Sequence, residues 1–261
     1  MNRSQLRRRR AGLASLAVSV ALGLLAHPVV AGAVADWFGG ARTAAYGLDR
    51  LADLALSHAT IALLAVVPAG ILGMSIGILV TRQAGRDLRP LSDVLVAASQ
   101  AVPPVVVVAL AFPAFGFGAV PTVLALACYI IMPVLRGTTA AIEAVPADVK
   151  EAARAMGMKQ HQVLWQVELP LAAPVIGESF RTAVTLAIAT AAVGALAGAA
   201  TLGTPIIVGL QNQNEVYILQ GAAATGALAF LADALLLLAM AAGDDRQRPG
   251  TAFLDLITFS R

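Results

Sequence analysis

The residues of this chain that could take part in chemistry are few, and their spacing does not build a catalytic or metal-binding set. The 261 residues include 15 acidic and 18 basic side chains, three histidines and a single cysteine. The sequence contains no GxxxxGKS or GxxxxGKT phosphate-binding loop, no HExxH zinc motif and no CxxC pair. The lone thiol of Cys128 cannot form an intrachain disulfide or a metal site. We therefore expect no catalytic residue, no resident metal and no cofactor.

Two sets of charged residues stand out by position: four between residues 148 and 154, and the pair Arg181 and Asp233, which interrupts apolar segments. Hydrophobic residues make up 59% of the chain, charged residues only 13%, and the mean hydropathy is +0.80. A soluble domain has about 45–50% apolar and about 25% charged residues. The chain is therefore expected to be an all-α membrane protein, which excludes a soluble globule, a disordered chain and a secreted disulfide scaffold.

Six apolar segments have about the length of a membrane-spanning helix, roughly 20 residues. The segments are 11–35, 58–81, 91–112, 120–135, 174–200 and 216–240. We divide the chain accordingly into an N-terminal part (1–57), a transmembrane domain (58–241) and a tail (242–261). A chain of this length has no room for a soluble ATPase or ligand-binding domain as well.

The N-terminal part permits two interpretations. The arginine run 7–10, the apolar stretch and the small residues 33–35 before Asp36 fit a cleavable signal peptide. The apolar run is longer than the roughly 7–15 residues of a signal-peptide core, however, and it is long enough to span a membrane despite the break at His27–Pro28. We favour an uncleaved first span. The mixed linker 39–57 that follows is compatible with a helix lying at the membrane surface.

The basic residues predict the orientation, because cytoplasmic loops retain lysine and arginine. With six spans and a cytoplasmic N-terminus, fifteen of the 18 basic residues fall on the cytoplasmic side. Both termini are therefore expected in the cytoplasm. The basic pI of about 9.5 follows from this topology, and binding to nucleic acid is not needed to explain it.

Four of the charges lie in a loop that is predicted to fold as a helix–turn–helix elbow, residues 148–170. Gly157 suits the left-handed geometry that ends a helix, and a second short helix is expected after it, with Pro170 at its boundary. Such an elbow is apolar enough either to dock on another protein or to rest on the membrane domain of its own chain. The residues that share one apolar helix face, by the spacing i, i+3, i+4, i+7, are Val149, Ala152, Ala153 and Met156.

The elbow resembles the EAA loop of ABC-importer permeases. The motif is Glu151-Ala152-Ala153, then Gly157, then Val167 and Leu169-Pro170, with Val167 where isoleucine is common. The resemblance extends over about residues 51–240. It implies a lipid-embedded permease subunit of the bacterial inner membrane that works with a second permease chain, separate ATPase subunits and an extracytoplasmic binding protein. It also implies that the elbow couples to the ATPase through Glu151, Ala152, Ala153, Arg154, Gly157, Leu169 and Pro170.

A second set of motifs resembles the permeases of quaternary-amine osmoprotectants, such as glycine betaine, choline and carnitine. It includes Arg181-Thr182-Ala183, Leu202-Gly203 and the segment 218–222. Ala200-Thr201 stand where that group has a Gly-Gly pair, so cargo preference is not carried over from this segment. The alternatives are an ABC permease for an amino acid or a sulfonate and an ion-coupled secondary transporter, which would often show inverted repeats.

Arg181 and Asp233 each lie about seven residues from the cytoplasmic end of a predicted span, and their two spans run antiparallel. Ionisable residues inside a membrane usually pair or face a cavity. We therefore predict a structural ion pair between the two side chains. The alternative is that Arg181 pairs with Glu178 at i, i+3 while Asp233 is solvated separately.

We expect the translocation path along the third and fifth spans. Pro103 and its proline neighbour free backbone carbonyls near the middle of the third span, close to Gln100, and such carbonyls suit a cationic ammonium group. A kink that serves packing alone is the alternative. Thr185 and Thr190 on the fifth span are candidates to line the same path, unless their hydroxyls bond to the preceding helical turn.

Overall fold

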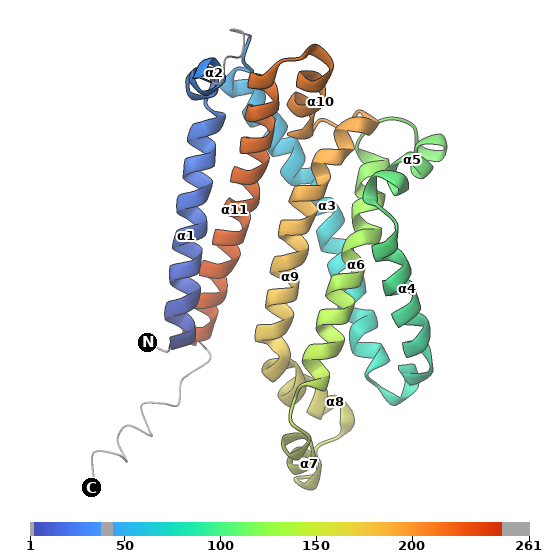
Figure 1. Cartoon of the computed structure of the whole chain (residues 1–261). Coiled ribbons are helices and arrows are strands. Elements are labelled where there is room, and N and C mark those ends of the chain that lie inside the picture. The colour runs from blue at the N-terminus through green and yellow to red at the C-terminus, as the bar shows by residue number, and fades with distance from the viewer. Residues whose placement is uncertain (1–2, 38–43, 247–261) are drawn as a thin grey trace, which may run out of the picture.

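The computed structural model of the chain describes residues 3–37 and 44–246, and the regular elements in these ranges are all helices. The long helices run roughly along one axis (Figure 1), with the elbow at one end of the bundle, here called the elbow end. The all-α architecture predicted from the sequence is confirmed. The apolar segment at the end of the predicted tail lies outside the described residues.

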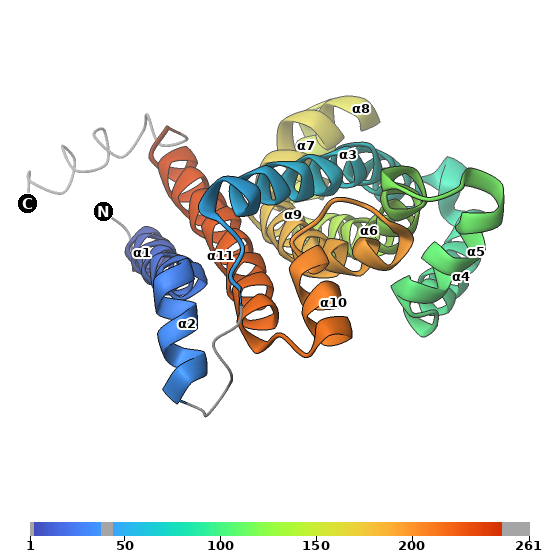
Figure 2. The ribbon, with the colours of Figure 1, turned by 90° about the horizontal axis from the view of Figure 1, so that it is seen from above.

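The N-terminal apolar stretch forms two helices, α1 (Arg3–Ala26) and α2 (Pro28–Trp37), which separate at the predicted break. Helix α1 packs along the last helix, α11 (Glu215–Arg246), and the two lie side by side in both views (Figures 1 and 2). Small buried side chains on α1 allow this contact, and the hydroxyl of Ser19 donates a hydrogen bond of 2.8 Å to the carbonyl of Ala227.

The core of the bundle is formed by α3 (Leu48–Val80), α6 (Ala119–Glu143) and α9 (Leu169–Ala191). Two glycines one helical turn apart let α3 and α6 approach closely. A Cβ on Gly73 would lie 2.6 Å from the carbonyl oxygen of Ile131, and one on Gly77 would lie 2.9 Å from that of Leu135. Small residues at such contacts are the usual means of helix packing in membranes.

Helix α3 is 33 residues long and begins ten residues before the predicted second span. Residues 48–57 of the linker are therefore helical, and they continue directly into the predicted second span. Leu51 and Leu54 are buried, with exposed fractions of 6% and 2%, so packing extends the helix toward its N-terminus. The first part of the linker, residues 39–43, lies outside the described residues.

The predicted third span is two helices, α4 (Arg89–Ala101) and α5 (Pro104–Phe115), bent by 94°. The residue before a proline is pushed out of the helical region. Val102 and Pro103 are accordingly both extended, with ψ angles of 118° and 139°. The break is confirmed, but a single straight span is not. By length and apolar composition the described residues contain five spanning helices, or six if the bent pair counts as one.

The end of the bundle opposite the elbow holds two further elements, the 3-10 helix η3 (Ala192–Ala197) and α10 (Gly203–Asn212). Helix α10 was not expected from the sequence. Seen from above (Figure 2), α3 covers one side of α9 and α6, and α10 and the α4–α5 pair flank them on the other.

Candidate functional site: the elbow and the charged residues of the bundle

The elbow, residues 148–170, projects beyond the ends of α6 and α9 (Figure 1). Its first helix is α7 (Ala147–Ala155), and Gly157 follows with a left-handed φ of 83°. The amide of Gly157 donates to the carbonyl of Arg154 at 2.9 Å, and that of Met158 donates to the carbonyl of Ala153 at 3.2 Å. These two bonds define a Schellman motif. The elbow therefore turns sharply through hydrogen bonds that depend on a glycine at position 157.

The four residues of the predicted apolar face, on α7 and its C-cap Met156, are not buried together. Ala153 is only 2% exposed, and α7 packs against the rest of the elbow, whereas Met156 is 77% exposed and Val149 is 37% exposed. Glu151, Ala152 and Arg154 are exposed as well. The expected single apolar face is thus divided between one anchoring residue and an exposed tip.

The second half of the elbow continues into the membrane bundle without a break. Helix α8 (Gln160–Val163) is followed by a π-helical turn, η2 (Leu164–Glu168), and then directly by α9. The boundary predicted at Pro170 is therefore wrong. Pro170 lies in the first turn of α9 after the wide π turn, where a missing amide hydrogen is tolerated. The elbow is consequently joined to α9 by one continuous helical segment.

Both contacts considered for Arg181 are present in the bundle. Its Nε donates to Asp233 Oδ1 at 2.7 Å, and its Nη1 donates to Glu178 Oε2 at 2.7 Å. Helix α1 extends this network, because the hydroxyl of Ser15 donates to Asp233 Oδ2 at 2.6 Å and Arg8 lies 3.5 Å from Glu178. The charges of α9 and α11 are therefore compensated by each other and by polar groups of α1.

Loss of the Ser15 hydroxyl is expected to lower the free energy of unfolding by about 1.5 kcal/mol, because a hydrogen bond to a charged group contributes roughly 1.5–3 kcal/mol. Denaturant titration of the Ser15→Ala variant in mixed micelles measures this. Ser75→Ala is the control, since its hydroxyl bonds only the carbonyl of Ile71 in its own helix. Equal effects of the two substitutions would contradict an anchoring role for Ser15.

The residues expected along a translocation path do not share one cavity. Thr185 lines a cavity of about 360 Å³ beside Arg181 and Asp233. Its hydroxyl donates to the carbonyl of Arg181 at 3.0 Å, which is the bond to the preceding helical turn named as the alternative. Thr190 is half-buried near the end of α9. Pro103 is exposed at the α4–α5 break. Gln100 belongs to α4, but its side chain lies outside the described part of the structure.

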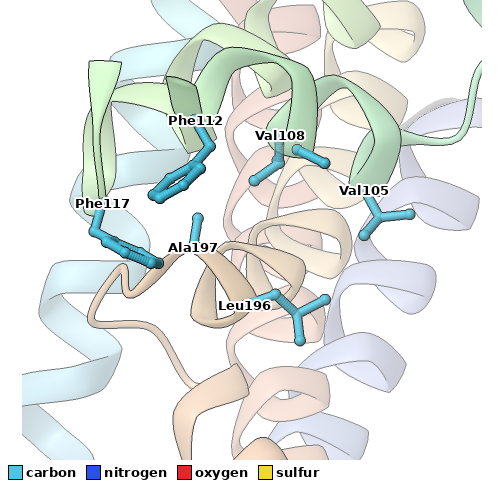
Figure 3. Close-up of a pocket in the computed structure, with 7 residues that line it drawn as sticks. Val105, Val108, Phe112, Phe117, Leu196 and Ala197 are labelled. Atoms are coloured by element: carbon cyan, nitrogen blue, oxygen red, sulfur yellow. The ribbon is translucent and has the colours of Figure 1, made fainter. Parts of the chain in front are cut away.

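A small apolar pocket of about 230 Å³ lies at the far end of the bundle between α5 and η3 (Figure 3). The rings of Phe112 and Phe117 meet over Ala197, with centroids 4.2 Å apart and an interplanar angle of 59°. This pocket was not predicted from the sequence; the aromatic residues beside the glycine turn at 116–118 were the one signal for it.

Comparison with known proteins identifies the family to which a chain with this elbow, helical bundle and buried charges belongs. The model of a family described as "Binding-protein-dependent transport system inner membrane component" matches residues 73–248. That range contains the whole elbow and the Arg181–Asp233 pair. The chain belongs to this family. It is an integral membrane permease, and α1 and α2 lie outside the matched range.

The permease is similar to several characterised relatives. The choline transport system permease protein OpuBB of Bacillus subtilis (strain 168) is 33% identical over 185 residues, 70% of this chain and 83% of the relative. The osmoprotectant import permease protein OsmW of Salmonella typhimurium is 34% identical, over 73% of this chain and 92% of the relative. The glycine betaine/carnitine/choline permease protein OpuCD of Bacillus subtilis is 35% identical, over 69% and 78%.

A solved structure supports the fold of the permease. A chain from the crystal structure of an amino acid ABC transporter with histidines superposes with a TM-score of 0.60 at 19% identity, over 77% of this chain and 94% of that chain. At this identity the likeness shows the fold alone.

The sequence did not indicate three polar contacts that link the helices of the permease. Glu168 is buried in η2 and accepts a hydrogen bond from Arg82, and Glu143 at the end of α6 pairs with Arg89. His58 is fully buried, donates from Nε2 to the carbonyl of Ile188 at 2.8 Å and accepts at Nδ1 from the amide of Leu202 at 3.1 Å.

Each of these contacts joins residues far apart in the chain, so neither local pattern nor spacing could reveal them. Among residues 3–37 and 44–246, no group of three or more His, Cys, Asp or Glu side chains is placed to hold a metal ion.

Proposed function

We propose that this permease forms part of the translocation path of an ATP-driven importer for small quaternary-amine osmoprotectants, such as glycine betaine, choline or carnitine. The observation that carries the proposal is the match to permeases named for these solutes at 33–35% identity over about 70% of the chain. In this proposal ATP is hydrolysed on separate subunits, a binding protein delivers the solute outside, and a second permease chain completes the path.

The elbow end faces the cytoplasm in this proposal, because lysine and arginine are concentrated there. The elbow is the docking site of the ATPase subunit. Its surface offers the apolar side chains of Met156 and Trp165, which are 77% and 67% exposed, as well as the exposed charges of Glu151 and Arg154. An apolar centre with a charged rim is the usual composition of a protein interface. Closure of the ATPase then moves α7 and, through η2, α9.

The aromatic pocket at the far end suits the trimethylammonium group that these solutes share. A quaternary ammonium is attracted to the face of an aromatic ring by its quadrupole, by about 0.5–1 kcal/mol at an exposed site. Phe112 and Phe117 supply two such rings in a largely apolar cavity (Figure 3). The pocket thus offers a weak and transient contact near the entrance of the path, and the separate binding protein supplies the affinity.

Replacing both pocket phenylalanines with leucine is expected to reduce choline uptake about threefold to fivefold at low concentration, as loss of a weak cation–π contact predicts. Phe115→Leu is the matched control, because Phe115 is exposed and does not line the pocket. Initial rates of radiolabelled choline uptake measure the effect. Equal uptake rates in the double variant and the control would show that the pocket is not part of the translocation path.

A competition experiment tests the proposed cargo. Cells that lack their own osmoprotectant uptake would express the permease with its cognate ATPase and binding protein, and would be given radiolabelled choline. We expect unlabelled glycine betaine and carnitine to compete, and arginine and taurine to have no effect. Uptake of an amino acid or a sulfonate that quaternary amines do not inhibit would overturn the cargo assignment.

A further inference from the structure

The segment between α3 and α4 is held at one end by an ion pair to the elbow and at the other by an ion pair to the end of α6. This segment, residues 82–89, consists of Arg82, the 3-10 helix η1 (Gln83–Leu88) and Arg89. Arg82 pairs with Glu168, which lies in the elbow, and Arg89 pairs with Glu143, the last residue of the helix that leads into the elbow. The end of α6, before the elbow, and η2, at the end of the elbow, therefore each hold one end of the same short segment.

In the Arg82–Glu168 pair, the carboxylate of Glu168 is the buried partner. The side chain of Glu168 is 4% exposed and that of Arg82 is 27% exposed. The guanidinium also donates to Thr81 Oγ1 from Nε at 3.0 Å and from Nη2 at 2.9 Å, and this hydroxyl donates in turn to the carbonyl of Ile78 at 2.7 Å. The arginine is thus fixed to the last turn of α3 while it binds the elbow. A buried carboxylate depends strongly on such a partner.

The ion pair between Arg89 and Glu143 is more exposed, but it is bidentate. Both terminal nitrogens of Arg89 reach the two carboxylate oxygens of Glu143, with Nη2 to Oε2 at 2.9 Å. A bidentate pair of this kind fixes orientation as well as distance. Arg89 is the first residue of α4, so Glu143 holds the start of this helix against the end of α6.

Between the two arginines the segment is compact. Gly85 is buried against α3, and a Cβ there would lie 2.3 Å from the carbonyl oxygen of Leu79. Helix α4 continues from Arg89 to the proline break, and α5 beyond the break packs on η3 beside the aromatic pocket. A connected path of packed elements therefore runs from the elbow to the far end of the bundle.

We propose that segment 82–89 transmits the movement of the elbow to the α4–α5 pair. Arg82 and Arg89 are the positioning residues that make the segment move with the elbow. This inference rests on the proposed function, because it assumes that the ATPase moves the elbow. When η2 and α6 shift together, both carboxylates pull the segment as a rigid body, and α4 moves with it. Without the pairs, α4 and α5 keep only their packing on α6 and η3, and they follow the movement of the elbow less closely.

The test measures solute imported per ATP hydrolysed, in proteoliposomes that contain the permease with its ATPase and binding protein and radiolabelled choline. Arg82→Gln and Glu168→Gln each remove the link, and the exchange Arg82→Glu with Glu168→Arg restores it with opposite polarity. Arg86→Gln is the matched control, since Arg86 is an exposed arginine of the same segment. A purely structural role would lower uptake and hydrolysis in proportion, so the ratio separates the two roles.

We expect both single variants to hydrolyse ATP at a rate within about twofold of the wild type while uptake per ATP falls at least about fivefold, a usual size for a coupling effect. The exchange variant should recover at least half of the ratio, and Arg86→Gln should leave it unchanged. A ratio that stays constant in both single variants, or failure of all three Arg82 and Glu168 variants to accumulate in the membrane, would overturn the proposal in favour of a structural pair.

A distance measurement provides a second test that does not need transport. Spin labels would be placed at the exposed positions Leu91 on α4 and Gln166 on the elbow, with Cys128 replaced by serine. The distance should be the same with and without ATP in the otherwise wild-type complex, and should change with ATP once Arg82→Gln and Arg89→Gln are introduced. A distance that changes equally in both would overturn the proposal. Absence of ATP-dependent uptake by the wild type would instead refute the proposed function.

Discussion

Choline uptake by the Gly157→Val variant is expected to fall at least about tenfold, while the amount of permease in the membrane stays close to that of the wild type. Gly157 has a φ of 83°, and a residue other than glycine held in such a conformation costs about 1–3 kcal/mol, most for a β-branched side chain. A cost of 1.4 kcal/mol already lowers the equilibrium constant for adopting a state about tenfold. The elbow would therefore seldom adopt the turn on which ATPase docking is proposed to depend.

The matched control for Gly157→Val is Gly47→Val. A Cβ at either glycine would meet no atom within 4 Å, but Gly47 has a φ of −64°, which valine adopts without strain. The contrast therefore isolates backbone conformation from crowding. Uptake rates and membrane amounts of both variants, determined on the same cells, measure the effect. Normal uptake by Gly157→Val would show that the observed turn of the elbow is not required.

Removing Arg181 is expected to destabilise the bundle more than any other single change among its intramembrane charges. Arg181→Leu would leave Asp233, whose side chain is 15% exposed, and Glu178 without the arginine that they share. Breaking a buried pair costs about 3–5 kcal/mol, and we expect about 2–3 kcal/mol here because the Arg181 side chain is 32% exposed. The free energy of unfolding in mixed micelles measures this loss.

The double variant Arg181→Leu with Asp233→Leu should regain most of that stability, because replacing a buried pair by apolar residues is often neutral. Exchanging the two charges is a poorer test, since an aspartate at position 181 would face Glu178. Arg86→Leu, at an exposed position, should change the free energy of unfolding by no more than about 0.5 kcal/mol. A double variant that is less stable than Arg181→Leu would contradict the pairing.

Features that depend on local chemistry were predictable from the sequence. Two adjacent prolines predict a break in the third span, and a glycine after an amphipathic helix predicts the turn of the elbow. The direction of the break was not predictable, because the 94° bend is set by packing of α5 on α6 and η3. Pro170 misled the prediction for a related reason: the π turn before it lets the helix continue through a residue that usually marks a boundary.

The charged residues show the same division between local and long-range information. The match in depth between Arg181 and Asp233 predicted their contact, because two antiparallel spans suffice to bring them together. The addition of Ser15 and Arg8 requires α1 to pack on α11, a contact between opposite ends of the chain. Arg82 and Glu168 are 86 positions apart and each resembles an ordinary loop charge, so only the assembled bundle reveals their pairing.

The central claim is that this permease imports quaternary amines with energy from ATP hydrolysed by a separate subunit. The most direct test is choline uptake by proteoliposomes that hold the permease with its ATPase and binding protein, with ion gradients collapsed by ionophores. We expect uptake to require ATP on the elbow side and to persist without any ion gradient. Uptake that needs an ion gradient and continues without ATP would contradict the claim and favour a secondary transporter.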